Sequence, residues 1–159
     1  LYPWLPFVDT LVPLHRSFLG LDLGLVVADG RRPSFRPGSF DRVLVDAPCS
    51  GLGVLRRRAD ARWRSGPDDV VALSDLQVEL LHGALPLVRP GGLLVYSVCT
   101  LTSAETSGVD RRFREATGLV SGPPLGAPWR PYGDDGAGGL LLPQDLDSEG
   151  MAVFRYRID

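Results

Sequence analysis

Short apolar runs along the chain predict the strands of an α/β domain. The runs are rich in leucine and valine and are bounded by glycine, proline or aspartate, as buried strands often are. The predicted strands are residues 23–28, 42–45, 93–97, 139–142 and 151–156. The last two enclose an acidic turn and are expected to form an antiparallel hairpin. A helical stretch separates strands 42–45 and 93–97, so these two are expected to form a parallel pair.

Two amphipathic helices are predicted between these strands. Apolar residues recur at three- and four-residue steps from Val70 to Leu87, and the segment 89–92, which contains a proline and two glycines, is expected to end this helix. The second helix is predicted to open with a capping box at Thr102–Glu105 and to end at Gly118. Residues 1–20 have no clear period, although a short helix could form there.

Composition and charge exclude several classes of protein. The net charge of −2 excludes a generally basic nucleic-acid-binding protein. The 17 basic residues are all arginines, which we attribute to genome composition and not to phosphate binding. Two cysteines do not make a disulfide scaffold. The chain has no apolar run of about eighteen residues and no signal peptide, so we expect a cytoplasmic protein without a membrane partner. It does not begin with methionine, and we expect a piece of a longer protein.

A loop rich in chemical groups follows the strand at 42–45. Its sequence is Asp-Ala-Pro-Cys-Ser-Gly-Leu-Gly over residues 46–53, at the end of a strand where parallel sheets usually bind ligands. Pro48 restricts the backbone before Cys49, and Gly51 and Gly53 allow conformations or close approaches that a Cβ would prevent. We therefore expect the Cys49 thiol to be exposed to a ligand. The alternative is a buried structural cysteine in an ordinary turn.

The second cysteine of the chain lies at an equivalent position. Cys99 follows the strand at 93–97, and neighbouring strands lie about 4.8 Å apart, so the two thiols are expected at the same edge of the sheet. This coincidence favours a two-thiol site over two structural cysteines. His82 has no acidic or cysteine partner at ligand spacing, so we expect it to be structural and expect no metal site.

An arginine-rich segment with a tryptophan follows the first cysteine loop. Such residues can grip phosphates and stack a base, which makes the segment a candidate for RNA binding. The candidates are Arg56, Arg57, Arg58, Arg62 and Trp63. The alternative is a solvated surface in a protein that uses arginine as its only long basic residue.

These motifs together resemble the Sun/Fmu (RsmB, Nop-type) family of RNA cytosine-5 methyltransferases. Asp-Ala-Pro-Cys-Ser-Gly-Leu-Gly-Val-Leu-Arg-Arg, followed fifty residues later by Tyr-Ser-Val-Cys-Thr, carries the resemblance, which runs from about Val26 to the carboxyl terminus. It includes the Ala-Asp-Gly-Arg-Arg-Pro turn and the helix that contains Gln77. The resemblance implies a Rossmann-like class I methyltransferase sheet that is mostly parallel and has a C-terminal antiparallel hairpin.

The resemblance also implies a reaction and roles for four residues. Members transfer a methyl group from S-adenosylmethionine to C5 of cytosine in RNA, in bacteria in small-subunit ribosomal RNA. Cys99 matches the nucleophile, and Cys49 matches the cysteine that assists product release. Asp29 and Asp46 match acids that contact the cofactor or the target base. A thiolate is suited to this chemistry, because its addition to C6 makes C5 nucleophilic.

The sequence departs from the family pattern at its amino-terminal side. Residues 1–25 contain neither the Gly-rich loop that holds the methionine end of the cofactor nor the acid that binds its ribose. Residues 1–159 are therefore interpreted as one truncated catalytic domain that lacks its N-terminal strands, with residues 1–20 poorly defined. A missing N-terminal region or a partner chain would complete the sheet, whose open edge would favour association.

Three functions remain open on the sequence. The first is RNA cytosine-5 methyl transfer through a covalent adduct of Cys99. The second is a non-catalytic remnant, or an RNA-binding module, that keeps the fold and cannot hold the cofactor alone. The third is DNA cytosine-5 methyl transfer with Cys49 as the nucleophile, against which the Tyr-Ser-Val-Cys motif argues.

Overall fold

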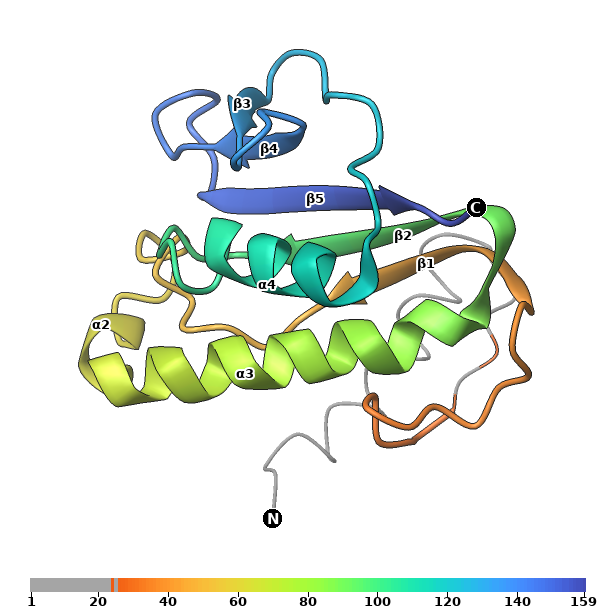
Figure 1. Ribbon diagram of the computed structural model, residues 1–159. Helices are drawn as coiled ribbons and strands as arrows, with labels where there is room; N and C mark the ends of the chain where they lie inside the picture. Colours follow the sequence, from red (N-terminus) through yellow and green to blue (C-terminus); the bar gives the residue numbers. More distant parts are fainter. Residues whose placement is uncertain (1–23, 25) are drawn as a thin grey trace.

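A mixed five-stranded sheet forms the centre of the protein (Figure 1). The structure is a computed structural model that describes residue 24 and residues 26–159. The strands lie in the order β1-β2-β5-β4-β3. Their bounds are β1 Phe40–Asp46, β2 Val88–Val98, β3 Arg130–Tyr132, β4 Gly138–Leu141 and β5 Met151–Arg157. The helices are α2 Ala61–Arg64, α3 Pro67–Ala84, the 3-10 turn η1 Leu85–Leu87, and α4 Ser107–Thr117.

Most strand pairs in the described sheet are antiparallel. β1 pairs with β2 in parallel, as the strand–helix–strand pattern predicted. The pairs β2–β5, β5–β4 and β4–β3 are antiparallel, and the predicted hairpin is confirmed in β4 and β5. The expectation of a mostly parallel sheet is therefore wrong for the described part of the chain, because only one crossover connection contributes a parallel pair here.

The predicted strand at 23–28 does not form in the described residues. Val26 and Val27 are 61% and 68% exposed and lie in irregular structure, while residues 23 and 25 lie outside the described residues. A short apolar run becomes a strand only when a neighbouring strand completes its hydrogen bonds. β1 ends the sheet among the described strands, so it is less buried than its apolar sequence predicts, and Leu44 is largely exposed. The short helix considered within residues 1–20 lies outside the described residues.

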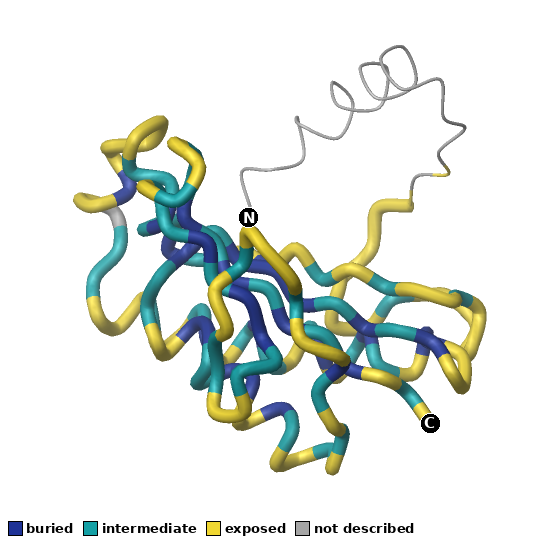
Figure 2. The backbone as a smooth tube through the Cα atoms, turned by 90° about the horizontal axis from the view of Figure 1, so that it is seen from above, coloured by how far each residue is buried: buried dark blue, intermediate teal, exposed yellow. Residues whose placement is uncertain are grey.

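The core lies between the sheet and the two longer helices. α3 and α4 pack side by side against the same face of the sheet, as Figure 1 shows. Phe113 of α4 is fully buried, and its ring makes edge contacts with Tyr156 of β5 at 4.9 Å and with His82 of α3 at 5.2 Å. Figure 2 shows that buried positions follow the central strands. His82 therefore has the structural contact expected of it.

Helix α3 begins at Pro67, one turn before the first residue of the apolar pattern, with the Gly66 amide donating to the Asp69 carboxylate at 2.8 Å. It ends at Ala84, earlier than the apolar pattern indicated, and the predicted helix stop at residues 89–92 lies inside β2 instead. The reason is that this segment pairs with neighbouring chain: the carbonyl of Ile158, just after β5, accepts from the Gly91 amide at 2.7 Å. By length and composition alone, residues 67–87 could cross a membrane, which the expectation of no such apolar run did not include; in the structure α3 contacts β1, β2 and α4.

Helix α4 ends as predicted but begins later. Gly118 adopts a left-handed conformation at its carboxyl end, with φ of 70°. The predicted capping box at Thr102–Glu105 does not start the helix, because α4 begins at Ser107 and Glu105 turns its carboxylate into the interior. That inward turn brings Glu105 to the cysteine loops.

Candidate active site

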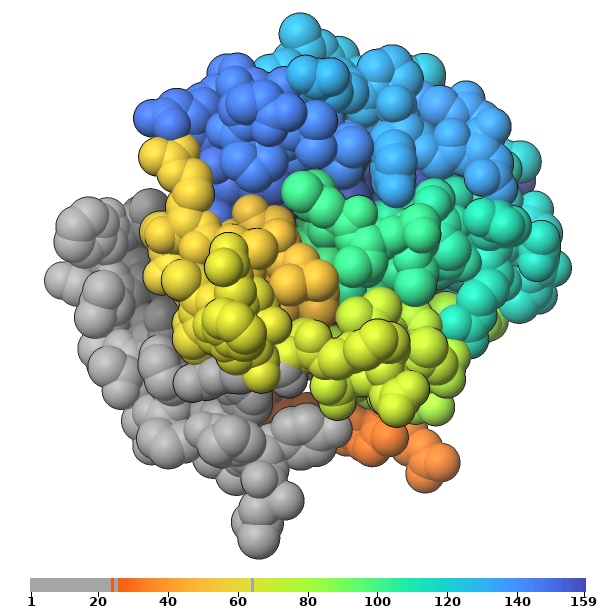
Figure 3. All heavy atoms as spheres, turned by 90° about the vertical axis from the view of Figure 1, so that its left-hand side faces the viewer, coloured from red at the N-terminus to blue at the C-terminus, as the bar shows by residue number. Residues whose placement is uncertain are grey.

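A cavity of about 620 Å³ lies at the carboxyl ends of β1 and β2. Asp46, Cys49, Arg58 and Cys99 line it together with the backbone of the first cysteine loop. Figure 3 looks onto this end of the molecule, where the segment after β1, in gold and yellow, lies below the blue C-terminal segment and beside the green helices. The structure therefore brings four of the predicted site residues to one place.

The parallel pairing of β1 with β2 places the two thiols side by side. Asp46 is in register with Ser97, and the Ala47 amide extends the pairing by donating to the Ser97 carbonyl at 3.0 Å. Cys49 lies two residues beyond Ala47 and Cys99 two residues beyond Ser97, and their sulfur atoms lie 3.3 Å apart. Both cysteines are free and partly buried. The expectation that both thiols emerge at one edge of the sheet is confirmed.

Gly53 lets the first loop pass close to the second. Its amide donates to the Cys99 carbonyl at 3.0 Å, and its carbonyl accepts from the Gly150 amide at 2.8 Å. A Cβ at this position would lie 2.1 Å from the Gly150 oxygen and 2.8 Å from the Cys99 oxygen. Only glycine fits between these two backbone segments.

Gly53→Ala is expected to lower the free energy of unfolding by about 1–3 kcal/mol, because the added methyl group forces rigid backbone apart. Urea unfolding followed by circular dichroism measures the loss. Gly126→Ala is the matched control, since nothing lies within 4 Å of a Cβ there. Equal losses in the two variants would show that the Gly53 contact does not hold the loops together.

The two thiols differ in acidity. The hydrogen bond from Cys49 lowers the pKa of Cys99 to about 7, and the nearby Arg58 acts in the same direction, against partial burial and the charge of Asp46. The same hydrogen bond, together with burial, raises the pKa of Cys49. Either sulfur atom can donate this hydrogen bond, and donation by Cys49 accounts for the directions of the two shifts. Cys99 is the more acidic thiol of the pair.

Alkylation of Cys99 by iodoacetamide is expected to rise about tenfold between pH 6 and pH 8, because the thiolate is the reactive form and forms as the pH passes its pKa of about 7. Below that pH the thiol is protonated and the rate falls. Peptide mass spectrometry separates Cys99 from Cys49. Cys49→Ala removes the hydrogen-bond donor and is expected to move the midpoint upward; an unchanged midpoint in that variant would contradict the assignment.

Of the two predicted cofactor acids, only Asp46 lies at the cavity with the cysteines. Asp29 binds the Arg31 guanidinium at 2.8–3.2 Å, which is the main reason that its pKa is lowered to about 2. It lines a separate cavity beside α3, together with Glu79 and His82. The described structure does not bring Asp29 to the thiols.

The predicted RNA-binding residues divide into two groups. Arg56 and Arg57 form ion pairs with Asp147 and Glu149 of the loop before β5. Arg58 lines the thiol cavity, whereas Arg62 and Trp63 lie exposed on α2, with Trp63 84% exposed. The first group is engaged in ion pairs, with the Arg56 and Arg57 side chains still 55% and 78% exposed, and the second group lies at or beside the thiol cavity.

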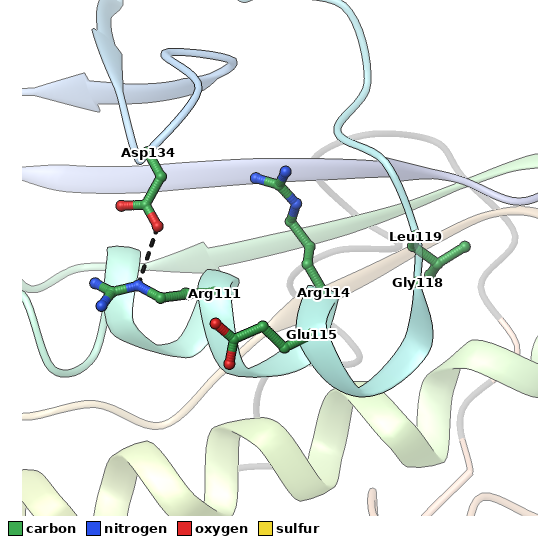
Figure 4. Close-up of a pocket in the computed structure, with 6 residues that line it drawn as sticks. All are labelled: Arg111, Arg114, Glu115, Gly118, Leu119 and Asp134. Atoms are coloured by element: carbon green, nitrogen blue, oxygen red, sulfur yellow. Dashed lines mark ion pairs between the residues drawn. The ribbon is translucent and has the colours of Figure 1, made fainter.

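Another cavity, of about 310 Å³, lies between α4 and the turn after β3 (Figure 4). Arg111 pairs with Asp134 at 3.0 Å across it, and Arg114 pairs with Asp135 at 2.9 Å. These acids neutralise the arginines that would otherwise attract an anion. The thiol cavity is therefore the better candidate for chemistry.

The prediction of the site missed a set of buried polar residues beneath the cysteine loops. Ser50, Gln77, Thr100 and Glu105 are buried and hydrogen-bonded to one another. Two of them directly follow a cysteine in the sequence, which is a signal that could have indicated them. Glu105 has the sequence context of a helix cap, so its neighbours in the sequence give no signal of its buried position.

Comparison with known proteins identifies relatives over much of the chain. The chain is 57% identical over 89 residues to "Putative methyltransferase Rv1407" of Mycobacterium tuberculosis, covering 56% of this chain and 19% of the relative. It is 42% identical over 125 residues to "Ribosomal RNA small subunit methyltransferase F" of Serratia proteamaculans, covering 76% of this chain and 26% of the relative. The chain thus spans about a quarter or less of the length of these relatives.

Solved structures share the fold. PH0851 superimposes with a TM-score of 0.85 at 27% identity, over 94% of this chain and 34% of the other. NSun6 from Pyrococcus horikoshii, solved with SFG, gives a TM-score of 0.74 at 24% identity, over 94% of this chain and 38% of the other, and shows the fold alone. Residues 12–121 match the family described as 16S rRNA methyltransferase RsmB/F. The chain belongs to this family and contains part of its domain.

Proposed function

We propose that the two-thiol cavity transfers a methyl group from S-adenosylmethionine to C5 of a cytosine in small-subunit ribosomal RNA. The observation that carries the proposal is the pair of sulfur atoms 3.3 Å apart, in which one thiol lowers the pKa of the other. A nucleophile beside a proton-bearing partner is the arrangement that covalent catalysis requires. Family membership supports the same reaction. The setting we propose is the cytoplasm.

The two cysteines perform different steps in this reaction. The Cys99 thiolate adds to C6 of the cytosine, which places electron density on C5. When bound, S-adenosylmethionine supplies an electrophilic methyl group to that carbon. A base then removes the C5 proton, and the bond from Cys99 to C6 breaks to release the RNA. Cys49, whose sulfur touches that of Cys99, is positioned to assist this release.

The residues at the cavity fit part of the cofactor's requirements. A volume of about 620 Å³ lies within the usual range for small-molecule sites, and apolar groups of Ala47, Pro48 and Val54 line one side. Asp46 is the carboxylate that would bind the cofactor or the target cytosine in this cavity. Asp29 lies at another cavity, so further contacts to the cofactor would have to come from outside the described residues.

The RNA would meet the cavity through the accessible basic and aromatic residues. Arg58, Arg62 and Trp63 lie at or beside it and offer cations for phosphates and a ring for stacking a base. The target cytosine has to leave its stack to reach the thiols. Because the overall charge is −2, this attraction depends on the local residues.

We also propose that the complete fold is the Rossmann-like class I methyltransferase sheet, with further strands beside β1. β1 is an edge among the described strands, and this chain covers only 34% of PH0851. A longer chain or a partner would supply those strands. The alternative function is a remnant or RNA-binding module that does not hold the cofactor, which the separate position of Asp29 favours.

Titration calorimetry and methyl transfer test the proposal on this chain. Heat on titration with S-adenosylmethionine, together with label transferred to a 16S rRNA fragment and not to DNA of the same sequence, is the expected result. Absence of heat at millimolar cofactor, with RNA still bound in a filter assay, would support the binding module instead. Transfer to the DNA in preference to the RNA would overturn the choice of substrate.

A further inference from the structure

We propose that Glu105 is a positioning residue that sets the distance between the Cys49 and Cys99 thiols. Its carboxylate is fully buried below the cavity and connects the loop after β1 to the loop after β2. The consequence for methyl transfer depends on the proposed function. The effect on the geometry of the two thiols does not.

The carboxylate holds the first cysteine loop through the residue next to Cys49. The Ser50 amide donates to one carboxylate oxygen at 2.8 Å, and the Ser50 hydroxyl donates to the other at 2.6 Å. Ser50 is buried, so neither group can turn to water. Two hydrogen bonds to one residue restrict both the backbone and the side chain at this point of the loop.

The same carboxylate holds the second cysteine loop. The hydroxyls of Thr100 and Thr102 donate to it at 3.2 and 2.8 Å, and Thr100 directly follows Cys99. The hydroxyls of Ser50 and Thr100 also lie 2.9 Å apart. One carboxylate therefore contacts the residue that follows each cysteine, and movement of either loop breaks bonds shared with the other.

Helix α3 anchors this carboxylate, and strand β2 anchors the backbone of the same residue. The Gln77 side-chain amide donates to Glu105 at 3.2 Å and to the Pro48 carbonyl at 2.9 Å. The Tyr96 hydroxyl lies 2.6 Å from the Glu105 carbonyl oxygen and 3.0 Å from the Gln77 side-chain oxygen. The loops are thus fixed against α3 and β2 as well as against each other.

A fully buried carboxylate is costly unless hydrogen bonds compensate for its lost hydration. Five donors surround Glu105, and it forms no ion pair with any residue in the described part of the chain. The donors come from three separate segments, so the carboxylate holds these segments together. This placement supports positioning of the thiols in addition to local stability.

Cross-linking with dibromobimane tests the proposal, because this reagent becomes strongly fluorescent when it joins two nearby thiols. Glu105→Ala is expected to lower the cross-linking rate about tenfold relative to the first alkylation, since a shift of about 1 Å spoils such geometry. Glu105→Gln is expected to stay close to the wild-type rate, because its oxygen accepts from the amides and its NH₂ donates to the hydroxyls.

Asp110→Ala is the matched control. Asp110 is another buried carboxylate, in α4, whose ion pair is with Arg114 and which contacts neither cysteine loop. This variant is expected to cross-link like the wild type at comparable loss of stability. A folded Glu105→Ala variant that cross-links at the wild-type rate would overturn the proposal, as would equal slowing in Asp110→Ala.

A second pair of variants covers the case in which Glu105→Ala does not fold. The test variant combines Ser50→Ala with Thr100→Val, which removes two hydroxyl donors to Glu105 and leaves its carboxylate. The control is Ser74→Ala, which removes a buried hydroxyl in α3, away from the cysteine loops. Slower cross-linking is expected only in the first, and an equal effect in both refutes the proposal. The assay needs neither RNA nor cofactor, so a failure of the methyltransferase proposal leaves its result readable.

Discussion

Cys99→Ala is expected to lower methyl transfer by about 10³-fold or more, because removing a covalent nucleophile eliminates the step that activates C5. The residue lies at the cavity and is the more acidic thiol of the pair. The variant is also expected to form no denaturant-stable complex with RNA that contains 5-fluorocytosine. Electrophoresis under denaturing conditions measures that complex, and cofactor labelled in its methyl group measures transfer.

Cys49→Ala is the informative partner of this variant. It keeps the nucleophile and removes the thiol placed to assist release, so covalent RNA complex is expected to accumulate while turnover falls. Formation of the complex should also shift to higher pH, because the hydrogen bond that lowers the pKa of Cys99 is lost. If the complex instead persists in Cys99→Ala and disappears in Cys49→Ala, Cys49 is the nucleophile and the DNA-type mechanism gains support.

Hydrogen peroxide is expected to convert both thiols into a Cys49–Cys99 disulfide. Because no thiol is then left, nearly all alkylation of the two cysteines by iodoacetamide is expected to stop. The Cys99 thiolate is oxidised to a sulfenic acid, and the Cys49 thiol, 3.3 Å away, condenses with it. In sum, two thiols and one peroxide give one disulfide and two waters. Intact-mass spectrometry detects the loss of two hydrogens, and dithiothreitol restores the thiols.

The Cys49→Ala variant shows whether the neighbouring sulfur causes this behaviour. Its Cys99 sulfenic acid lacks an internal partner, so peroxide is expected to carry it to oxidation states that dithiothreitol does not reverse. The wild-type chain should remain monomeric on a non-reducing gel after treatment. Cross-linked dimers in place of an internal disulfide would contradict the close approach of the two sulfur atoms.

The meeting of the two thiols could be predicted from the sequence because it depends on a general property of parallel strands. Each cysteine follows an apolar run within a few residues, and the β1–β2 pair brings both to one edge. The β4–β5 hairpin and the end of α4 at Gly118 depend on similarly local signals.

Features that depend on distant partners could not be predicted in the same way. The run at 23–28 is apolar enough for a strand, and it lacks a neighbouring strand among the described residues. Glu105 has the sequence context of a helix cap, yet donors from the β1 loop and α3 draw it inward. Arg56 and Arg57 pair with acids some ninety residues later, which no local pattern reveals.

The position of β1 at the edge of the described sheet has a consequence for motion. An edge strand held on one side opens more readily than a central one, and amide hydrogen exchange reports such opening. Cys49 lies three residues beyond the end of this edge strand, whereas Cys99 directly follows the interior strand β2. Opening of β1 is therefore expected to move Cys49 more than Cys99, and a strand that pairs with the side of β1 left unpaired among the described strands is expected to lengthen the time that the two sulfur atoms spend together.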